Sequence, residues 1–377
     1  SAIGNINSYT SNLAVEFSSF VQGINYVTIR VFDKVDLCST AVDVFNVKKD
    51  TTGPTVDATA ESGQDTTWRT NSTARNYNVN LSDPESLLKN IEYAVWTSSG
   101  QSGAPLIDWT ALATSWNQNS YTADWTPDFA ALTEAGTNYV SVRANDYLSQ
   151  YTTSYNVFYI RKDITNPQIQ NNMPAGADAT WRKSNDGYYN VDFYDTGGSQ
   201  LQYVQYRSST TGTWTNINTP NTTFYIDNWQ INTGTFTALS EGQLYFGVRA
   251  VDFAGNALIL NDAYFVRKDT TSPTIQDNQS EDNTWHASNN GTYNVDLQDA
   301  NSGAGIQSFS IRASSDSSGS GPWQTSWTTV LTTDTYNYTT NWPLPNSVWT
   351  QMLSGTTNYV WVQGYDFAAN TTTTAGY

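Results

Sequence analysis

The chain has 377 residues, of which only 14% are charged, and its formal net charge is −17. This charge argues against nucleic acid, whose binding rests on Lys and Arg that neutralise phosphate, and against an anionic membrane surface. The single cysteine, Cys38, excludes a disulfide within the chain, and the sequence contains no apolar run of 18 residues that would predict membrane insertion.

The N-terminal 49 residues contain two segments that return later in the chain. VQGINYVTIRVFDKVDLC (21–38) is matched by runs at 132–150, 239–256 and 353–370, and FNVKKD (45–50) by FYIRKD (158–163) and YFVRKD (264–269). The Trp and Tyr-Asn-Val segments that precede these runs elsewhere are missing here. Residues 1–49 are therefore predicted to be the C-terminal half of a repeat. We expect both ends to be cut from a longer array, with the missing strands upstream or in a neighbouring subunit.

Three further repeats follow, which we call repeat A (50–162), repeat B (163–268) and repeat C (269–377), and the last stops before the expected F-x-x-K-D. Each begins at the Asp of a Lys-Asp pair, as in KDTTGPT (49–55) and KDTTSPT (268–274), and has the same landmarks in the same order. The landmarks are a Trp segment (66–69, 179–182, 283–286), a Tyr-Asn-Val segment (77–80, 189–192, 293–296) and the run that ends in an Asp loop (132–150, 239–256, 353–370).

Within these segments the hydrophobic period is two, which is typical of strands. In 139–146, Val140, Val142 and Ala144 alternate with larger or polar residues. Turn signals separate the strands, and we expect hairpins at 185–187 and 289–291. Only 82–90 could form a short helix. Several short strands in about 110 residues predict an all-β fold of tandem β-sandwich repeats.

The run L-x-x-G-x-x-Y-x-V-x-V-x-A-x-D-x-A-G-N, followed by a D-T-T-x-P linker, resembles bacterial immunoglobulin-like and fibronectin-III-like repeats. Such repeats occur in large cell-surface adhesins, extracellular filament proteins and accessory regions of secreted enzymes. The resemblance implies a tyrosine corner at four positions: Tyr26, Tyr139, Tyr245 and Tyr359.

The sequence offers few residues that could form a catalytic site. His286 is the only histidine and stands where the other repeats have Arg69 and Arg182, so nucleophilic triads and His-rich zinc sites are excluded. Most acids recur by repeat instead of forming a unique pair. We expect no enzymatic activity.

Tryptophan is abundant, and nine of the 14 residues recur once per repeat, which predicts core or interdomain packing. Trp361 differs, because it replaces Ser141 and Gly247 on the outward face of its strand. With Trp323 and Trp349 it is predicted to form an exposed aromatic contact patch, for another protein surface or for a ligand.

Two series of Asp residues are candidate calcium ligands at the junctions between repeats, because calcium takes six to eight oxygen ligands. A calcium site would form only if the Asp loop of one repeat lies next to acidic residues of an adjoining repeat. The alternative is that a linker Asp simply caps a turn through its side chain. One series lies in the loop after the Tyr strand (Asp33, Asp146, Asp252, Asp366) and the other in the linkers (Asp50, Asp163, Asp269).

Together these features predict a structural or adhesive extracellular array, a stalk, filament or surface-layer segment on a bacterial cell surface. Its expected partners are copies of itself or neighbouring repeats, and surface glycans. The alternatives are a carbohydrate-binding or spacer region of a secreted enzyme and, third, a fibre on a virion.

Overall fold

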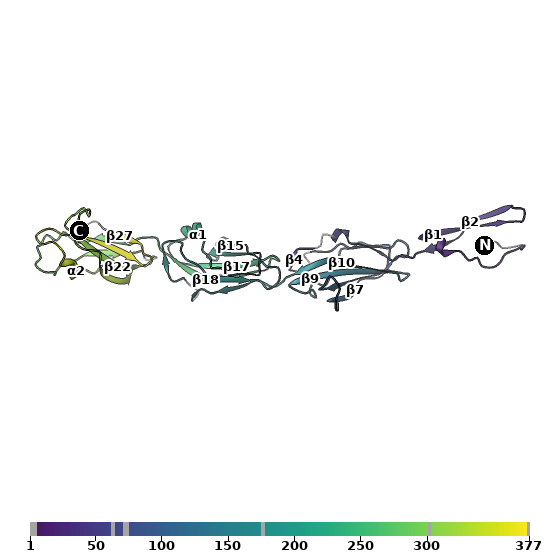
Figure 1. Ribbon diagram of the computed structural model, residues 1–377, viewed down its shortest axis with the longest axis horizontal. Helices are drawn as coiled ribbons and strands as arrows, with labels where there is room; N and C mark the ends of the chain where they lie inside the picture. The colour runs from purple at the N-terminus through teal and green to yellow at the C-terminus, as the bar shows by residue number, and fades with distance from the viewer. Residues whose placement is uncertain (1–5, 62–64, 71–74, 175–177, 301–302, 375–377) are drawn as a thin grey trace. The chain divides into compact units, whose positions relative to one another are not determined.

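The structure is a computed structural model that describes residues 6–61, 65–70, 75–174, 178–300 and 303–374. The chain divides into two compact units, Ser1–Ile164 and Thr165–Tyr377, and each is treated by itself. Among the described residues no helix is long and apolar enough to cross a membrane. The fold is built almost wholly from antiparallel strands (Figure 1).

The first unit begins with a two-stranded hairpin. The 3-10 turn η1 (Phe17–Ser19) precedes β1 (Gly23–Phe32), which pairs antiparallel with β2 (Cys38–Lys49). No residue between 6 and 49 is buried, and large apolar side chains such as Tyr26 are exposed. This hairpin therefore has no hydrophobic core of its own.

Repeat A is a β-sandwich of a five-stranded and a three-stranded sheet. Between them lies a core that includes Tyr77, Trp125, Val140, Val142 and Phe158. The larger sheet has the order β4 (Trp68–Arg69), β10 (Tyr151–Lys162), β9 (Gly136–Asp146), β6 (Leu88–Trp96), β7 (Ile107–Gln118), and the smaller β3 (Thr55–Asp57), β5 (Asn80–Ser82), β8 (Ser120–Tyr121), with η2 (Thr59–Glu61) after β3.

Repeat B, in the second unit, has the same two sheets around a core that includes Tyr189, Trp229, Phe246 and Tyr264. Its short helix α1 (Thr233–Ala238) is capped by the side chain of Asn232. The larger sheet has the order β12 (Trp181–Arg182), β18 (Ala257–Lys268), β17 (Gly242–Asp252), β14 (Leu201–Ser208), β15 (Thr215–Asn218), and the smaller β11 (Gln168–Asn171), β13 (Val191–Tyr194), β16 (Phe224–Tyr225).

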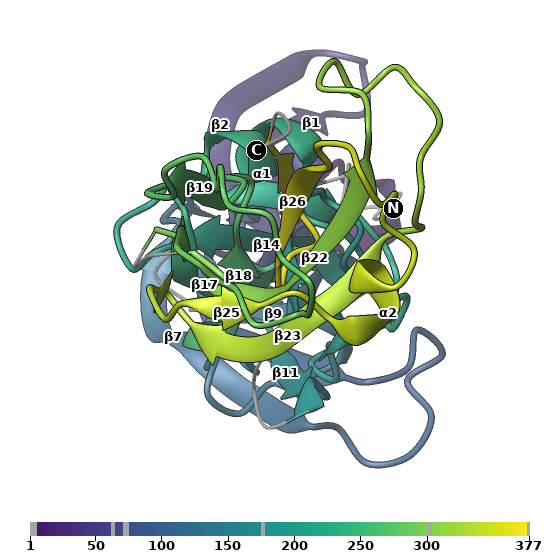
Figure 2. The same cartoon turned by 90° about the vertical axis from the view of Figure 1, so that its left-hand side faces the viewer.

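Repeat C repeats this plan, and Figure 2 shows β22, β23 and β26 in one layer. Its core includes Phe309, Ile311, Trp342 and Val362, and its helix is α2 (Asn346–Trp349). The sheets are β23 (Thr328–Thr335), β22 (Ile306–Ser314), β26 (Tyr359–Asp366), β27 (Thr371–Thr373); β19 (Thr274–Asp277), β21 (Val295–Gln298), β24 (Asn337–Tyr338); and β20 (Thr292–Tyr293), β25 (Trp342–Pro343).

Two local predictions are wrong. Residues 82–90 do not form a helix: Asp83 caps a turn by accepting from the N–H groups of Glu85 and Ser86, and the chain then enters β6. Residues 289–291 do not close a hairpin, because β20 pairs with β25. Residues 185–187 do not close one either, because β12 pairs in parallel with β18 whereas Tyr189 pairs with Trp229. The segment is a crossover between the two sheets.

The tyrosine corner is also absent from the positions that the resemblance implies. Tyr245 is 49% exposed and its hydroxyl bonds the side chain of Gln243. The preceding residue takes the corner role in repeat A: Asn138 is buried, accepts from the Thr133 N–H at 2.9 Å and donates to the Thr133 and Ile160 carbonyls. Asn25 and Asn358 make the same kind of bonds to Val21 and Leu353.

Candidate cation sites at the N-terminal ends of the repeats

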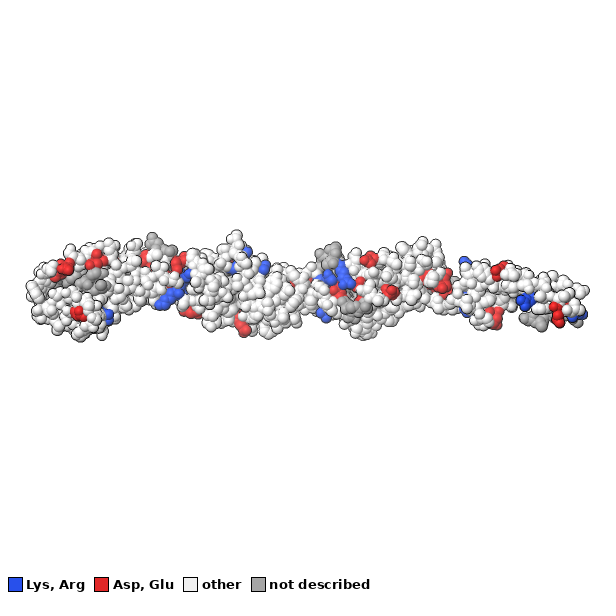
Figure 3. All heavy atoms as spheres, turned by 90° about the horizontal axis from the view of Figure 1, so that it is seen from above, with Lys and Arg blue, Asp and Glu red and all other residues white. Residues whose placement is uncertain are grey.

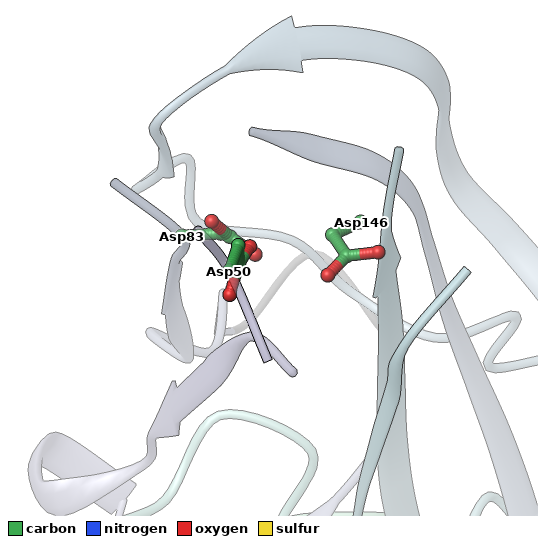
Figure 4. A group of neighbouring side chains, drawn as sticks. All are labelled: Asp50, Asp83 and Asp146. Carbon is green, nitrogen blue, oxygen red and sulfur yellow. The ribbon is translucent and has the colours of Figure 1, made fainter. Parts of the chain in front are cut away.

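Three aspartates meet at the N-terminal end of repeat A. Asp50 follows β2 in the linker, Asp83 follows β5, and Asp146 is the last residue of β9. One carboxylate oxygen from each lies within 4.8 Å of the others, and Figure 4 shows Asp50 next to Asp83 with Asp146 opposite. The linker and both sheets of the sandwich therefore contribute to one acidic cluster.

Repeat C forms the same cluster from the equivalent positions. Asp269 lies in the linker after β18, Asp299 follows β21, and Asp366 ends β26, again with oxygens within 4.8 Å of one another. All three residues are at most 2% exposed. Gly303 packs against the carboxylates so closely that a Cβ there would lie 2.9 Å from an Asp269 oxygen.

The Tyr strand has a structural reason to end in Asp. The Asp146 backbone N–H donates to the Gln150 carbonyl at 3.2 Å, and its carboxylate accepts the Gln150 N–H at 2.8 Å. Asp366 makes the same two bonds with Asn370. The side chain closes the turn and at the same time points a charge into the cluster.

Several carboxylate oxygens in the clusters have no protein partner. In repeat A these are Oδ2 of Asp50 and Oδ2 of Asp83, and in repeat C it is Oδ1 of Asp299. Asp83 is 3% exposed and Asp299 2% exposed. A buried, unpartnered oxygen of a charged group is costly, and a cation or its hydration shell at each cluster would supply the missing partner.

The electrostatics of the cluster in repeat C point the same way. Burial, together with the negative charge of Asp269, raises the pKa of Asp299 above its usual range. Burial also raises the pKa of Asp366, with smaller contributions from Asp269 and Asp299. In repeat A, hydrogen bonds from Ser86 and Thr52 outweigh the effect of burial and lower the pKa of Asp50. No Lys, Arg or His of the described chain forms an ion pair with these six aspartates.

The cluster geometry suits a hard divalent cation. Two oxygens on opposite sides of a calcium ion, each at 2.3–2.6 Å, are about 5 Å apart, and the carboxylates here meet within 4.8 Å. On the face in Figure 3, other acids are scattered over a largely uncharged surface. The clusters are therefore compatible with calcium because they are convergent and buried, and not because the chain is acidic.

Four of the seven predicted ligands converge within a single unit. The structure brings together Asp50 with Asp146 and Asp269 with Asp366. Asp33 is exposed and its carboxylate accepts from the N–H groups of Val35 and Leu37, so it only caps its own turn. Asp163 and Asp252 are buried in their respective units.

Sequence reasoning missed the third ligand of each cluster, Asp83 and Asp299, with Asp195 at the equivalent position of repeat B. A signal was available. Each of these Asp residues lies six residues after the Tyr of its Tyr-Asn-Val segment (Tyr77, Tyr189, Tyr293), whereas the loops that they begin, DPES, DTGG and DANSG, differ.

The exposed aromatic patch predicted from Trp323, Trp349 and Trp361 is not found. Trp361 lies on the outward face of β26, opposite Arg312 of β22, but is only 5% exposed. Trp323 packs edge-on against it, with the ring centroids 4.8 Å apart, and the loop at Gly319 covers it. Trp349 instead packs against the core from α2. Of the nine recurring tryptophans, Trp285 is 75% exposed, and those in the core are Trp125, Trp229 and Trp342.

The opposite end of each repeat contains a second polar cluster. In repeat A, Asp65 pairs with Arg69 at 2.9 Å and accepts from the Tyr77 hydroxyl at 2.9 Å. In repeat B, Arg182 pairs with Asp178 and Asp186, both at 2.6 Å. In repeat C the same place is taken by His286, which bonds Asp282 at 2.8 Å and Asn290 at 3.0 Å.

Comparison with known proteins gives similarity only among solved structures. No family model matches the chain, and no curated protein matches it. The similar structures include fibronectin(III)-like modules of Clostridium thermocellum CbhA (12% identity, TM-score 0.24, covering 57% of this chain and 94% of that one). A second is a Ca2+-stabilized adhesin that helps an Antarctic bacterium bind ice (14% identity, TM-score 0.35, covering 92% of this chain and 79% of that one). A third is a 1.5-MDa bacterial ice-binding adhesin (13% identity, TM-score 0.31, covering 84% of this chain and 93% of that one). These likenesses concern the β-sandwich fold alone.

Proposed function

We propose that the chain is a segment of an extracellular structural or adhesive array on a bacterial cell surface, with repeat boundaries at 50–162, 163–268 and 269–377. Three hydrophobic cores, each drawn from residues within one of these ranges, support this division. Residues 1–49 are proposed to be the second half of a further sandwich, because their hairpin buries none of its described residues.

The array is proposed to bind calcium where a linker enters a repeat. The observation that carries this proposal is the unpartnered, buried oxygen of Asp83 and of Asp299 inside a group of three carboxylates. A calcium ion would neutralise the repulsion between the carboxylates and join the linker to both sheets of the sandwich. Linkers fixed in this way would give a stiff array.

The partners of such an array are neighbouring repeats, other copies of the chain and surface glycans. A carbohydrate-binding region of a secreted enzyme is the competing function. The aromatic patch predicted as its ligand site is not exposed, because Trp361 is buried and Trp323 packs against it. The structural role is therefore the better supported one.

The test uses the full chain, freed of metal with a chelator and dialysed against calcium. Elemental analysis should find bound calcium, calorimetry should show higher melting temperatures with calcium than with chelator, and small-angle scattering should show a more extended particle with calcium. Absence of bound calcium together with unchanged melting would overturn the calcium sites. Tight binding to polysaccharides, without any effect of calcium on the dimensions, would favour the competing function.

A further inference from the structure

The two clusters that share one pattern of aspartates differ in the residue that closes the loop. In repeat C this residue is Asn370, which is 8% exposed. Its amide nitrogen donates to Oδ2 of Asp366 at 2.8 Å and to the backbone carbonyls of Asp269 and Thr271 at 3.1 and 3.3 Å. One side chain thus attaches the linker backbone to the loop of the repeat.

In repeat A the same position is Gln150. Its amide nitrogen lies 3.3 Å from Oδ2 of Asp146, and among the described residues it donates to no linker carbonyl. The longer side chain therefore reaches only acceptors that belong to the acidic cluster. Residue Asp50, which brings the linker into this cluster, is partly exposed and keeps an unpartnered Oδ2.

The other contacts of the two linkers are alike in part and differ in part. In the linker of repeat C, the Asp269 N–H donates to the Arg182 carbonyl, Thr270 bonds Glu241, and the Asp269 carboxylate accepts the Ala304 N–H at 2.6 Å. That linker is fixed by protein groups alone. In the linker of repeat A, Thr51 and Thr52 bond the side chain of Gln22 in the hairpin, as Thr270 bonds Glu241. The carboxylate of Asp50 accepts from Thr52, its near neighbour in the chain, and no hydrogen bond between described residues joins this linker's carbonyls to the side chain of Gln150.

We infer that the amide four residues after the loop Asp sets whether a junction needs its cation: Asn370 latches the linker of repeat C without one, whereas Gln150 leaves the linker of repeat A to be fixed by the ion. The inference rests on the proposed calcium sites and adds their regulation. When calcium falls, the linker at Asp50 loosens while the linker at Asp269 stays in place. Asn370 and Gln150 act as positioning residues and not as principal ligands.

The experiment is hydrogen–deuterium exchange by mass spectrometry on the full chain, with calcium and with chelator. In the native chain, calcium should slow exchange strongly in peptides that cover 50–54 and little in those that cover 269–272. Gln150→Asn should protect 50–54 even with chelator, and Asn370→Gln should make protection of 269–272 depend on calcium. Core peptides from β9 and β26 report whether each variant is folded.

Equal calcium dependence of the two linkers in the native chain would overturn the inference, as would an Asn370→Gln variant whose linker stays protected in chelator. Failure of the calcium sites themselves gives a different result. Elemental analysis would then find no ion and neither linker would respond to calcium, which overturns the ion-dependent half. Faster exchange at 269–272 in Asn370→Gln would still support the latch.

Discussion

The backbone N–H of Asp269 donates to the carbonyl oxygen of Arg182 at 3.0 Å, so the linker aspartate of repeat C is held by the last residue of β12 in repeat B. Arg182 is itself fixed by its pairs with Asp178 and Asp186. In the first unit, Asp163 donates in the same way to Arg69 at 3.1 Å. Within the second unit, the polar cluster around Arg182 thus also positions the linker aspartate of the candidate cation site in repeat C.

Replacing Asp299 with Asn should have opposite effects with and without calcium. With chelator, the variant removes one of three repelling buried charges and keeps an acceptor for the Gly305 N–H, so the melting temperature of repeat C should rise. With calcium, the stabilisation by ligand should shrink; for a native site it is about 2.7 kcal/mol at free calcium 100 times the Kd. Calorimetry measures both.

Repeat A is the internal control for this variant, because its own cluster is unchanged and its calcium response should be retained. A lower melting temperature of repeat C in chelator would show that the Asp299 charge is stabilising, contrary to the electrostatic argument. Asp83→Asn is the matched variant in repeat A. With this variant, repeat A should lose its response to calcium and repeat C should keep it.

Replacing Asn138 with Ala should destabilise repeat A. The side chain closes a corner with three hydrogen bonds, and its loss leaves the buried Ile160 carbonyl without this donor. The expected decrease in the free energy of unfolding is about 1–3 kcal/mol, measured by chemical denaturation. Tyr139→Phe is the control and should have little effect. A larger loss of stability in Tyr139→Phe than in Asn138→Ala would show instead that the tyrosine closes the corner.

The sequence was sufficient for the fold because the strand period of two and the repeat landmarks depend on local residue patterns. Val140, Val142 and Ala144 face the core as the alternation predicts. The resemblance to immunoglobulin-like repeats implies a corner at Tyr139, whereas the neighbouring Asn138 makes the hydrogen bonds that close it. Hydrogen bonds to backbone groups distant in the chain leave no periodic signal.

The candidate site could be predicted only in part, for a geometric reason. Asp50 and Asp146 recur and are visible in the sequence, but whether they meet depends on which end of the sandwich each strand leaves. Asp83 also recurs, as Asp195 and Asp299, six residues after the Tyr of the Tyr-Asn-Val segment, but the different loops that follow these residues obscure the repeat. Exposure of Trp361 was misjudged because the covering loop around Gly319 is far from it in sequence.

The stability of repeat C should depend on pH near neutrality through His286. Its hydrogen bonds to Asp282 and then Asn290 raise the pKa of the imidazole in the folded state. A histidine with a raised pKa stabilises the fold fully below its unfolded value, about pH 6.5, and this contribution is lost as the pH rises through the folded value. The melting temperature of repeat C, followed by calorimetry, should therefore fall across that window.

His286→Arg should flatten this dependence, because an arginine stays charged and repeats A and B already have Arg69 and Arg182 at this position. The lowered pKa of Asp282 acts in a separate, acidic window, since its contribution is lost only as the pH falls through its folded value. A pH dependence unchanged in His286→Arg would assign the effect to other groups.

Replacing Trp361 with Ser tests the covered outer face of repeat C. Although repeats A and B have Ser141 and Gly247 at this position, Trp361 is 5% exposed and packs against Trp323, whose ring also lies 3.2 Å from the Arg312 guanidinium. Truncation of a buried tryptophan typically costs about 3–5 kcal/mol, so the repeat C transition should shift to clearly lower temperature. Trp285→Ser, at a residue that is 75% exposed, is the matched control and should leave the transition in place. Equal and small effects of the two substitutions would show that the loop at Gly319 does not pack on Trp361 in solution, and would return this tryptophan to the set of surface contacts.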